Sequence, residues 1–122
     1  MKVLVVDGNR NISQALSSYI KLFGHETDEA NNGREAIRQL QGSRYDIVVT
    51  DSEIIGVDGA ELCKFIKSNF QDIYIIGISG YLSALKDLAD AGADICFSKP
   101  FCLDELMKAM ECFQQFITRG TR

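Results

Sequence analysis

Four hydrophobic runs of this chain each lead into a polar residue that can serve phosphate or metal chemistry. These polar residues are two carboxylic acids, an alcohol and an amine: Asp7, Asp51, Ser79 and Lys99. The runs that carry them are Val3–Val6, Ile47–Thr50, Ile73–Ile78 and Ile95–Ser98. If the runs are parallel strands, their carboxyl ends share one edge of a sheet, where ligands bind in open α/β folds. The four side chains would then converge on one crevice.

Such a set of side chains suits phosphate or metal chemistry. Carboxylates are ligands for hard cations such as Mg²⁺, and a carboxylate can also act as a nucleophile. Ammonium and hydroxyl groups bind phosphoryl oxygens by charge and hydrogen bonding. Taken singly, each residue could instead be a helix cap, a turn residue or a surface charge. Four matched residues at four strand ends favour a site.

The elements that would position this site alternate along the chain. Apolar runs with strand character alternate with segments in which apolar residues recur at three- and four-residue spacing, the pattern of repeated βα units. Asn32 and Glu35, like Asp58 and Glu61, have the spacing of a helix N-cap and the third helical residue. The pattern predicts an α/β fold with a doubly wound, five-stranded parallel sheet.

Composition also predicts the order of the strands. The second strand, His25–Ala30, is almost wholly polar and suits the edge of a sheet, whereas the first, third and fourth runs are apolar on both faces. Right-handed crossovers then leave few strand orders, and the order 2-1-3-4-5 satisfies these requirements. We expect one domain over residues 1–118 with a loose tail over 119–122. Helical apolar residues expected in the core include Ile12, Phe23, Leu103 and Ile117.

Bulk properties exclude several classes of protein. The chain has 122 residues, 46 % of them hydrophobic, enough for one domain with a real core. Its net charge is −4 and its Lys and Arg residues are scattered, which argues against direct nucleic-acid binding. No apolar stretch approaches the ~20 residues that cross a bilayer, and no signal peptide is evident, so a cytoplasmic protein is expected. The four cysteines form no C-x-x-C pair and are expected to be buried, reduced thiols.

With these residues, the chain resembles the receiver domains of two-component response regulators, the CheY-like family. The matching segments span nearly the whole chain: V-L-V-V-D at 3–7, D-I-V-V-T-D at 46–51, D-G at 58–59, G-I-S-G at 77–80 and S-K-P-F at 98–101. Each motif alone is weak, but their order and their places at strand ends are specific. The resemblance implies the flavodoxin/CheY-like (βα)5 fold.

The resemblance also implies a phosphoprotein of a two-component signal transduction system or phosphorelay. Asp51 would accept a phosphoryl group from a sensor histidine kinase or a histidine phosphotransfer protein, and the domain would signal to an unknown effector. The domain would assist its own phosphorylation and dephosphorylation without being an enzyme. Magnesium, with Mn²⁺ as a substitute, would be held by Asp7, Asp51 and the backbone carbonyl of Glu53.

The remaining site residues implied by the resemblance would bind the phosphoryl oxygens. Lys99 would contact one oxygen as a point charge, while the Ser79 hydroxyl and the Gly80 N–H would bind another. The transition state spreads negative charge over these oxygens, so catalysis would be mostly positioning and electrostatics.

Three positions are expected to tune the site or the switch. Family members usually carry a second acid at the position of Gly8, so metal binding is expected to be weak unless the Glu53 carboxylate turns inward; Glu53 could equally be a repulsive gate or a solvated loop residue. Cys96 stands where the family usually has a Tyr or Phe that reports phosphorylation. The signal is then expected to pass through Ser79 and residues 81–91. Tyr81 could shield the phosphoryl group or supply the missing aromatic ring.

Other functions remain open at the level of sequence. Gly8 and Cys96 fit a pseudo-receiver, a protein-interaction module that works without phosphorylation. A haloacid dehalogenase-type phosphatase carries D-x-D after its first strand, whereas here Asp51 follows the third. A flavodoxin-like cofactor carrier lacks support because no phosphate-binding loop follows the first strand. An output or homodimer surface is expected on the face formed by residues 81–91, 95–97 and 103–117.

Overall fold

Five strands and five helices alternate in the part of the chain that the computed structural model describes, residues 1–118. The predicted tail at 119–122 lies outside the described residues. The strands are β1 (Lys2–Val6), β2 (Glu26–Ala30), β3 (Ile47–Asp51), β4 (Tyr74–Ser79) and β5 (Ile95–Ser98). The helices are α1 (Arg10–Lys21), α2 (Gly33–Gly42), α3 (Gly59–Asn69), α4 (Leu82–Asp90) and α5 (Leu103–Thr118).

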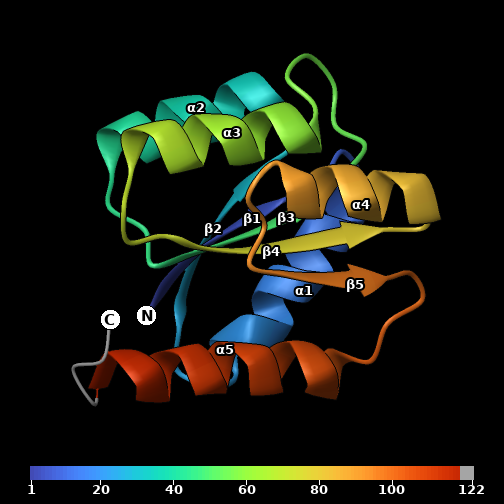
Figure 1. Cartoon of the computed structure of the whole chain (residues 1–122). Coiled ribbons are helices and arrows are strands. Elements are labelled where there is room, and N and C mark those ends of the chain that lie inside the picture. The colour runs from blue at the N-terminus through green and yellow to red at the C-terminus, as the bar shows by residue number, and fades with distance from the viewer. Residues whose placement is uncertain (119–122) are drawn as a thin grey trace.

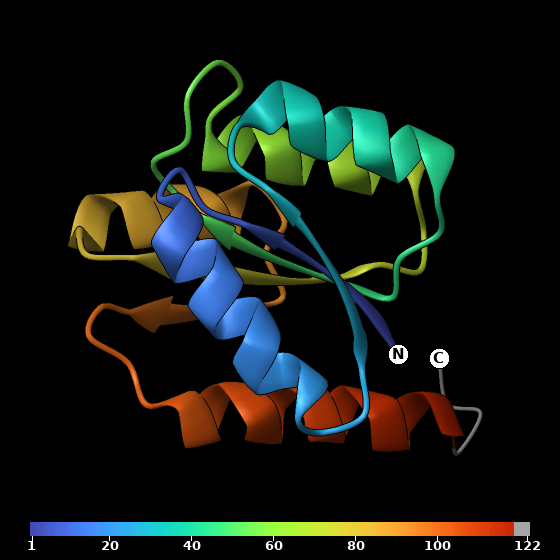
Figure 2. The same cartoon turned by 180° about the vertical axis from the view of Figure 1, so that it is seen from behind.

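The strands form one parallel sheet in the order β2-β1-β3-β4-β5, which confirms the predicted fold and strand order. Helices α2, α3 and α4 cover one face of the sheet, and α1 and α5 cover the other (Figures 1 and 2). The chain winds in opposite directions on either side of the boundary between β1 and β3. The carboxyl ends of these two strands therefore flank the crevice where such sheets bind ligands.

Two strands begin one residue later than predicted: β2 begins at Glu26 and not at His25, and β4 begins at Tyr74 and not at Ile73. Tyr45, which precedes β3, is buried and donates a hydrogen bond from its hydroxyl to Asp28 Oδ2 at 2.6 Å. At the other end, β3 and β4 include their last polar residues, Asp51 and Ser79. These two residues are consequently held in the ladder itself and not in the loops that follow.

β2 is the polar edge strand that the sequence predicts. Its polar side chains meet serines of α1, since Ser13 and Ser17 are buried against it. The Ser17 hydroxyl donates to Thr27 Oγ1, and the Ser13 hydroxyl donates to Glu29 Oε1 at 3.2 Å. Hydrogen bonds therefore replace apolar packing between α1 and this strand.

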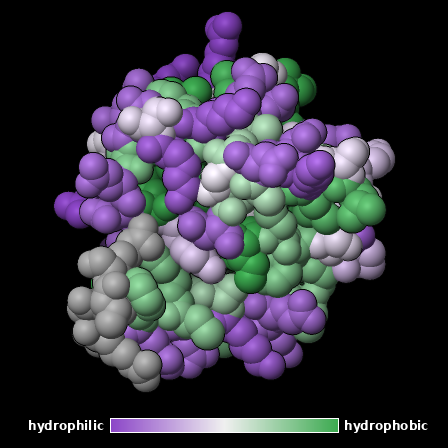
Figure 3. Space-filling model, viewed as in Figure 1, coloured by the Kyte–Doolittle hydropathy of each residue, from purple (hydrophilic) through white to green (hydrophobic). Residues whose placement is uncertain are grey.

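β5 forms the opposite edge, and three of its four residues are only partly buried. Hydrophobic residues lie between α4 and α5 on this side of the molecule, with hydrophilic side chains above and below them (Figure 3). Among residues 1–118, no helix combines the length and the apolar composition that crossing a bilayer requires. This face is the one on which an output or homodimer surface is expected.

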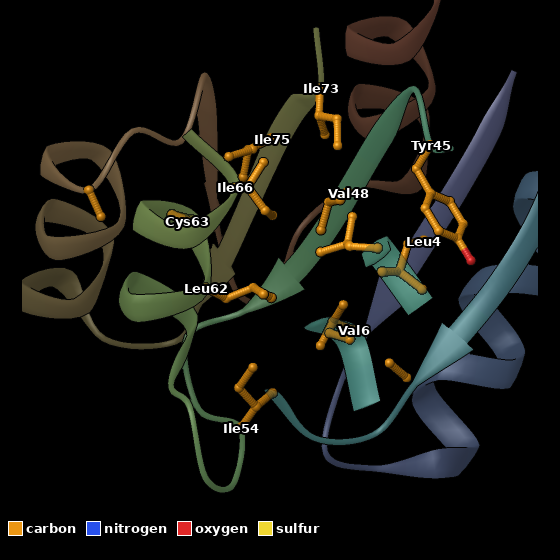
Figure 4. Packing of buried hydrophobic residues seen from close by; sticks show 14 of the residues in the cluster. Leu4, Val6, Tyr45, Val48, Ile54, Leu62, Cys63, Ile66, Ile73 and Ile75 are labelled. Carbon is orange, nitrogen blue, oxygen red and sulfur yellow. The ribbon is translucent and has the colours of Figure 1, made fainter. Parts of the chain in front are cut away.

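Two hydrophobic clusters hold the three layers together. In one, Leu62 and Ile66 project from α3 toward Val48 and Ile75 of the sheet (Figure 4). The other lies between the sheet and the pair α1 and α5, and its members include Ile20, Ile76 and Met110. Strand residues of alternate parity supply the two clusters, as expected for strands buried on both faces.

Several residues expected in the core are exposed. Ile12, Phe23, Leu103 and Ile117 are all solvent-exposed. Phe23 lies beyond the end of α1, and Leu103 and Ile117 lie in the first and last turns of α5. Ile12 lies beside the fully buried Ser13, so in the first turn of α1 the serine and not the isoleucine faces β2. The expectation of buried thiols is also wrong for Cys102 and Cys112, which are exposed, although all four cysteines are free.

Helix α3 approaches the end of β3 closely because Gly59 lacks a side chain. A Cβ atom at Gly59 would lie 2.5 Å from the Asp51 carbonyl oxygen and 2.8 Å from Ser52 Cα, both backbone atoms. The helix begins at this glycine, with Asp58 as the predicted N-cap accepting a hydrogen bond from Glu61 N at 2.9 Å. Gly59 thus allows α3 to begin directly against the strand end that carries Asp51.

We expect Gly59→Ala to lower the free energy of unfolding by about 1–3 kcal/mol, because the backbone on both sides must shift to admit the methyl group. Gly42→Ala is the matched control, since nothing lies within 4 Å of a Cβ atom there. That change should leave stability unchanged or raise it by up to about 1 kcal/mol through helix propensity. Urea denaturation of the three proteins measures both effects, and equal stability of all three would contradict the close contact.

Candidate phosphoryl-acceptor site

Strand register brings the four predicted polar residues to one edge of the sheet. Val6 pairs with Thr50, so the next residues along, Asp7 and Asp51, are neighbours. Ser79 pairs with Ser98 across the β4–β5 boundary, and the Lys99 N–H donates to the Ser79 carbonyl oxygen at 2.9 Å. The side chains from four strand ends therefore share one site.

Lys99 interacts with both carboxylates. Its Nζ donates a hydrogen bond to Asp51 Oδ2 at 3.0 Å and lies 3.8 Å from Asp7 Oδ2. The Asp51 side chain keeps 14 % of its surface exposed, so one side of the carboxylate is open to a reaction partner. A single ammonium group thus offsets two adjacent negative charges in the unmodified site.

Asp7 is the more enclosed of the two acids, with 11 % of its side-chain surface exposed. Burial raises the pKa of its carboxyl above the ordinary value, and the charge of Asp51 acts in the same direction. The Asn9 backbone N–H, which donates to Asp7 Oδ1 at 2.9 Å, lowers the pKa, as does Lys99. The net shift is upward, so the folded site disfavours the ionised form of Asp7.

Ser79 is completely buried, and its hydroxyl is fixed by two neighbours. Ser79 Oγ accepts a hydrogen bond from Ser52 Oγ at 2.8 Å and another from the Tyr81 backbone N–H at 3.1 Å. The Ser52–Ser79 hydrogen bond therefore connects the loop that begins after Asp51, at the end of β3, to the end of β4.

The other residues predicted for metal and phosphoryl binding surround the acids. Glu53 is exposed, and its backbone N–H points at Asp51 Oδ1 at 3.4 Å. Gly8 is exposed, and a Cβ atom there would lie 3.7 Å from the Glu53 carbonyl oxygen. Gly80, also exposed, directly follows Ser79. Within residues 1–118, no group of three or more His, Cys, Asp or Glu side chains is arranged to hold a metal.

The two residues expected to affect switching, Tyr81 and Cys96, lie at the start of α4 and on β5. Tyr81 is 59 % exposed and directly precedes α4, without a side-chain capping bond. Cys96 is partly buried beneath α4, where its thiol donates to the Leu85 carbonyl oxygen at 3.8 Å. Burial raises the pKa of the Cys96 thiol, and that of the buried Cys63 thiol to about 12. Both are therefore protonated packing groups.

Three residues of the site were not predicted from the sequence: Ser52, Asn9 and Asn31. Asn31 donates from Nδ2 to the Asp7 carbonyl oxygen at 2.8 Å and to Ser13 Oγ at 3.0 Å. Asn31 directly follows β2, so its position at the same edge as Asp7 could have been found from the predicted strand order. The Asn9 contact is made by backbone, which residue type does not reveal.

Comparison with known proteins decides the family. The model of the response regulator receiver domain matches residues 3–111, most of the chain. The chain belongs to the response regulator receiver family. Response regulator MprA of Mycolicibacterium vanbaalenii is 34 % identical over 112 residues, which cover 90 % of this chain and 48 % of MprA. The receiver thus spans about half the length of the curated relatives it matches.

Solved receiver structures share the whole fold. Response regulator TrrA from Thermotoga maritima, in complex with Mg²⁺-BeF, is 33 % identical with a TM-score of 0.84, covering 92 % of this receiver and 97 % of that chain. Chemotaxis response regulator CheY4 of Vibrio cholerae is 27 % identical with a TM-score of 0.83, over 92 % and 97 % of the two chains. The predicted CheY-like family is therefore confirmed.

The upward shift of the Asp7 pKa predicts a pH-dependent effect of Asp7→Asn. The folded wild type holds this proton more tightly than the unfolded chain, so its stability falls as pH rises from about the ordinary value of 3.8 through the raised pKa. Asn does not ionise and avoids this loss. We expect Asp7→Asn to be more stable than wild type at pH 7, with a difference that shrinks as pH is lowered toward 4.

Urea denaturation from pH 4 to 7.5 measures this difference, with Asp90→Asn as the control at an exposed acid of α4. A variant that is less stable than wild type at pH 7 would mean that the attraction to Lys99 outweighs the cost of burial. A difference that does not change with pH would also contradict the assignment to ionisation of Asp7.

Proposed function

We propose that this receiver accepts a phosphoryl group on Asp51 from the phosphohistidine of a sensor histidine kinase or a histidine phosphotransfer protein. The observation that carries the proposal is the 3.0 Å contact of Lys99 Nζ with Asp51 Oδ2, at a strand end beside Asp7. This contact places a cation where negative charge develops during phosphoryl transfer. The partly exposed Asp51 carboxylate is the nucleophile.

In the proposed transfer, an Asp51 carboxylate oxygen bonds to phosphorus while the bond from phosphorus to the donor imidazole nitrogen breaks. The donor imidazole, which carries a proton on its other ring nitrogen, keeps the electron pair of that bond and leaves as neutral imidazole, and the product is an aspartyl phosphate. Lys99 Nζ binds a phosphoryl oxygen, and the Ser79 hydroxyl and Gly80 N–H donate to another. The domain assists this reaction and the later hydrolysis by positioning and charge, acting as a signalling protein and not as a turnover enzyme.

We propose Mg²⁺ as the cofactor, with Mn²⁺ as a substitute. The carboxylates of Asp7 and Asp51 and the carbonyl of Glu53 form an all-oxygen donor set, which suits a hard divalent cation. When bound, the cation neutralises negative charge on the acids and the phosphoryl group. The TrrA structure with Mg²⁺-BeF supports this assignment by its similarity to the present chain. The glycine at position 8 leaves the set one carboxylate short.

We propose that the protein is cytoplasmic and that phosphorylation changes the face formed by α4, β5 and α5. Ser79 leads into α4, and the Tyr81 N–H is bonded to the Ser79 hydroxyl, so a new bond from Ser79 to a phosphoryl oxygen acts on the start of that helix. The partly exposed β5 and the hydrophobic residues around it supply a surface for an effector or a second copy of the domain (Figure 3).

Treatment with acetyl phosphate and Mg²⁺ should add one phosphoryl group to the intact protein, because Asp51 is a carboxylate nucleophile beside Lys99. We expect Asp51→Asn to abolish the mass increment and EDTA to suppress it. Intact-mass spectrometry measures both. An increment that survives Asp51→Asn would place the phosphoryl group elsewhere, and no increment with any donor would favour a pseudo-receiver.

Gly8→Asp should tighten Mg²⁺ binding by on the order of tenfold, because it adds a charged oxygen ligand to the set. The substitution is sterically open, since Gly8 does not have a positive φ and the only atom near a Cβ there is the Glu53 carbonyl oxygen at 3.7 Å. Isothermal titration measures the change, with Gly8→Asn as the uncharged control. Equal affinities for wild type and Gly8→Asp would mean that Glu53 or water already fills this position.

A further inference from the structure

Ser52, the residue directly after the phosphoryl acceptor, makes a hydrogen bond to Ser79, one of the residues proposed to bind the phosphoryl group. Its hydroxyl donates to Ser79 Oγ at 2.8 Å, across the ends of β3 and β4. We propose that Ser52 is a positioning residue that directs the hydroxyl proton of Ser79 toward the phosphoryl group on Asp51. This role rests on the proposed function, because it requires a phosphoryl group at Asp51.

The number of hydrogen bonds that a hydroxyl can form supports this role. A serine hydroxyl has two acceptor lone pairs and one proton to donate. In Ser79, the Ser52 hydroxyl and the Tyr81 N–H occupy the two acceptor positions. The remaining capacity of the group is donation, and Ser79 is completely buried, so bulk water does not compete for the proton. A phosphoryl oxygen at Asp51 supplies the acceptor.

Ser52 is held firmly enough to act in this way. Its backbone N–H donates to the Ile78 carbonyl oxygen at 2.9 Å, and its carbonyl oxygen accepts from the Gly59 N–H at 3.1 Å. The missing side chain of Gly59 lets α3 lie directly against Ser52 Cα. β4 on one side and the start of α3 on the other therefore fix the backbone that carries the Ser52 hydroxyl. Ser52 in turn holds the Ser79 hydroxyl, which is then a pre-positioned donor that loses little entropy when the phosphoryl group arrives.

The effect of Ser52 is specific to Ser79, although Ser52 lies beside the acceptor in the chain. Its backbone follows that of Asp51 directly, but its hydroxyl points across to Ser79 and not to the acids. Removal of the hydroxyl should thus weaken the interaction of Ser79 with a phosphoryl group and leave the metal-binding oxygens of Asp7 and Asp51 in place.

A double-mutant cycle on Ser52 and Ser79 tests the proposal. The proteins are wild type, Ser52→Ala, Ser79→Ala, the double variant and Ser52→Thr, which keeps the hydroxyl. Ser68→Ala, at an exposed serine of α3, is the control. Isothermal titration measures the affinity for beryllium fluoride at saturating Mg²⁺ and, separately, the affinity for Mg²⁺ alone. Urea denaturation confirms that every variant is folded.

We expect Ser52→Ala to weaken binding of beryllium fluoride by about 3- to 10-fold in the wild-type background, the effect of one hydrogen bond. The same change should have no further effect in the Ser79→Ala background, while Ser52→Thr stays within about twofold of wild type. Mg²⁺ affinity should be unchanged in all of these variants, because each of them keeps Asp7 and Asp51.

Equal effects of Ser52→Ala in both backgrounds would overturn the role of Ser52 and leave phosphorylation of Asp51 intact. A parallel loss of Mg²⁺ affinity would overturn it too, because the variant would then disturb the whole site. Failure of the wild type itself to bind beryllium fluoride would overturn the proposed function and, with it, the role of Ser52. The wild-type measurement thus separates the two failures.

Discussion

One ammonium group placed between two carboxylates is the interaction on which this receiver depends. Burial of Asp7 makes its ionised form costly, and repulsion between the two acids at adjacent strand ends adds to this cost. Lys99 offsets that cost by contact with Asp51 and proximity to Asp7. A new anion at the site would compete with the two carboxylates for Lys99. A phosphoryl group on Asp51 is such an anion, so the interaction that holds the unmodified site is also the one that the modification changes.

The sheet supplies the geometry for this interaction, and small residues let the surrounding elements approach it. Parallel pairing sets Asp7 beside Asp51, and sets Ser79 beside Ser98, the residue before Lys99. Gly59 allows α3 to begin against the acceptor strand, and this contact also holds the backbone of Ser52. Rigid strand ends and a fixed serine pair therefore surround an acid that keeps one open side, which combines pre-organisation with access for a phosphoryl donor.

Fold and strand order could be predicted because periodicity and polarity vary strongly along this chain. The polar β2 suits an edge and the apolar β1, β3 and β4 suit the interior, so with right-handed crossovers the strand ends that carry Asp7, Asp51, Ser79 and Lys99 come to one edge of the sheet. The exposure of Ile12 and Phe23 could not be predicted, because helical spacing shows neither that Ser13 would face β2 in place of Ile12 nor that α1 would end before Phe23. Nor could the contacts of Ser52 and Asn9 be predicted, since they depend on hydroxyl direction and backbone placement and not on residue type.

A crystal structure of the receiver with Mg²⁺ and beryllium fluoride tests most directly whether Lys99 changes partners. We predict beryllium bonded to an Asp51 carboxylate oxygen, Lys99 Nζ within hydrogen-bond distance of a fluorine, and loss of the 3.0 Å contact between Lys99 Nζ and Asp51 Oδ2. The Ser79 hydroxyl should contact a second fluorine. Beryllium fluoride bound away from Asp51, or a lysine that still contacts both carboxylates with no fluorine beside it, would contradict the exchange.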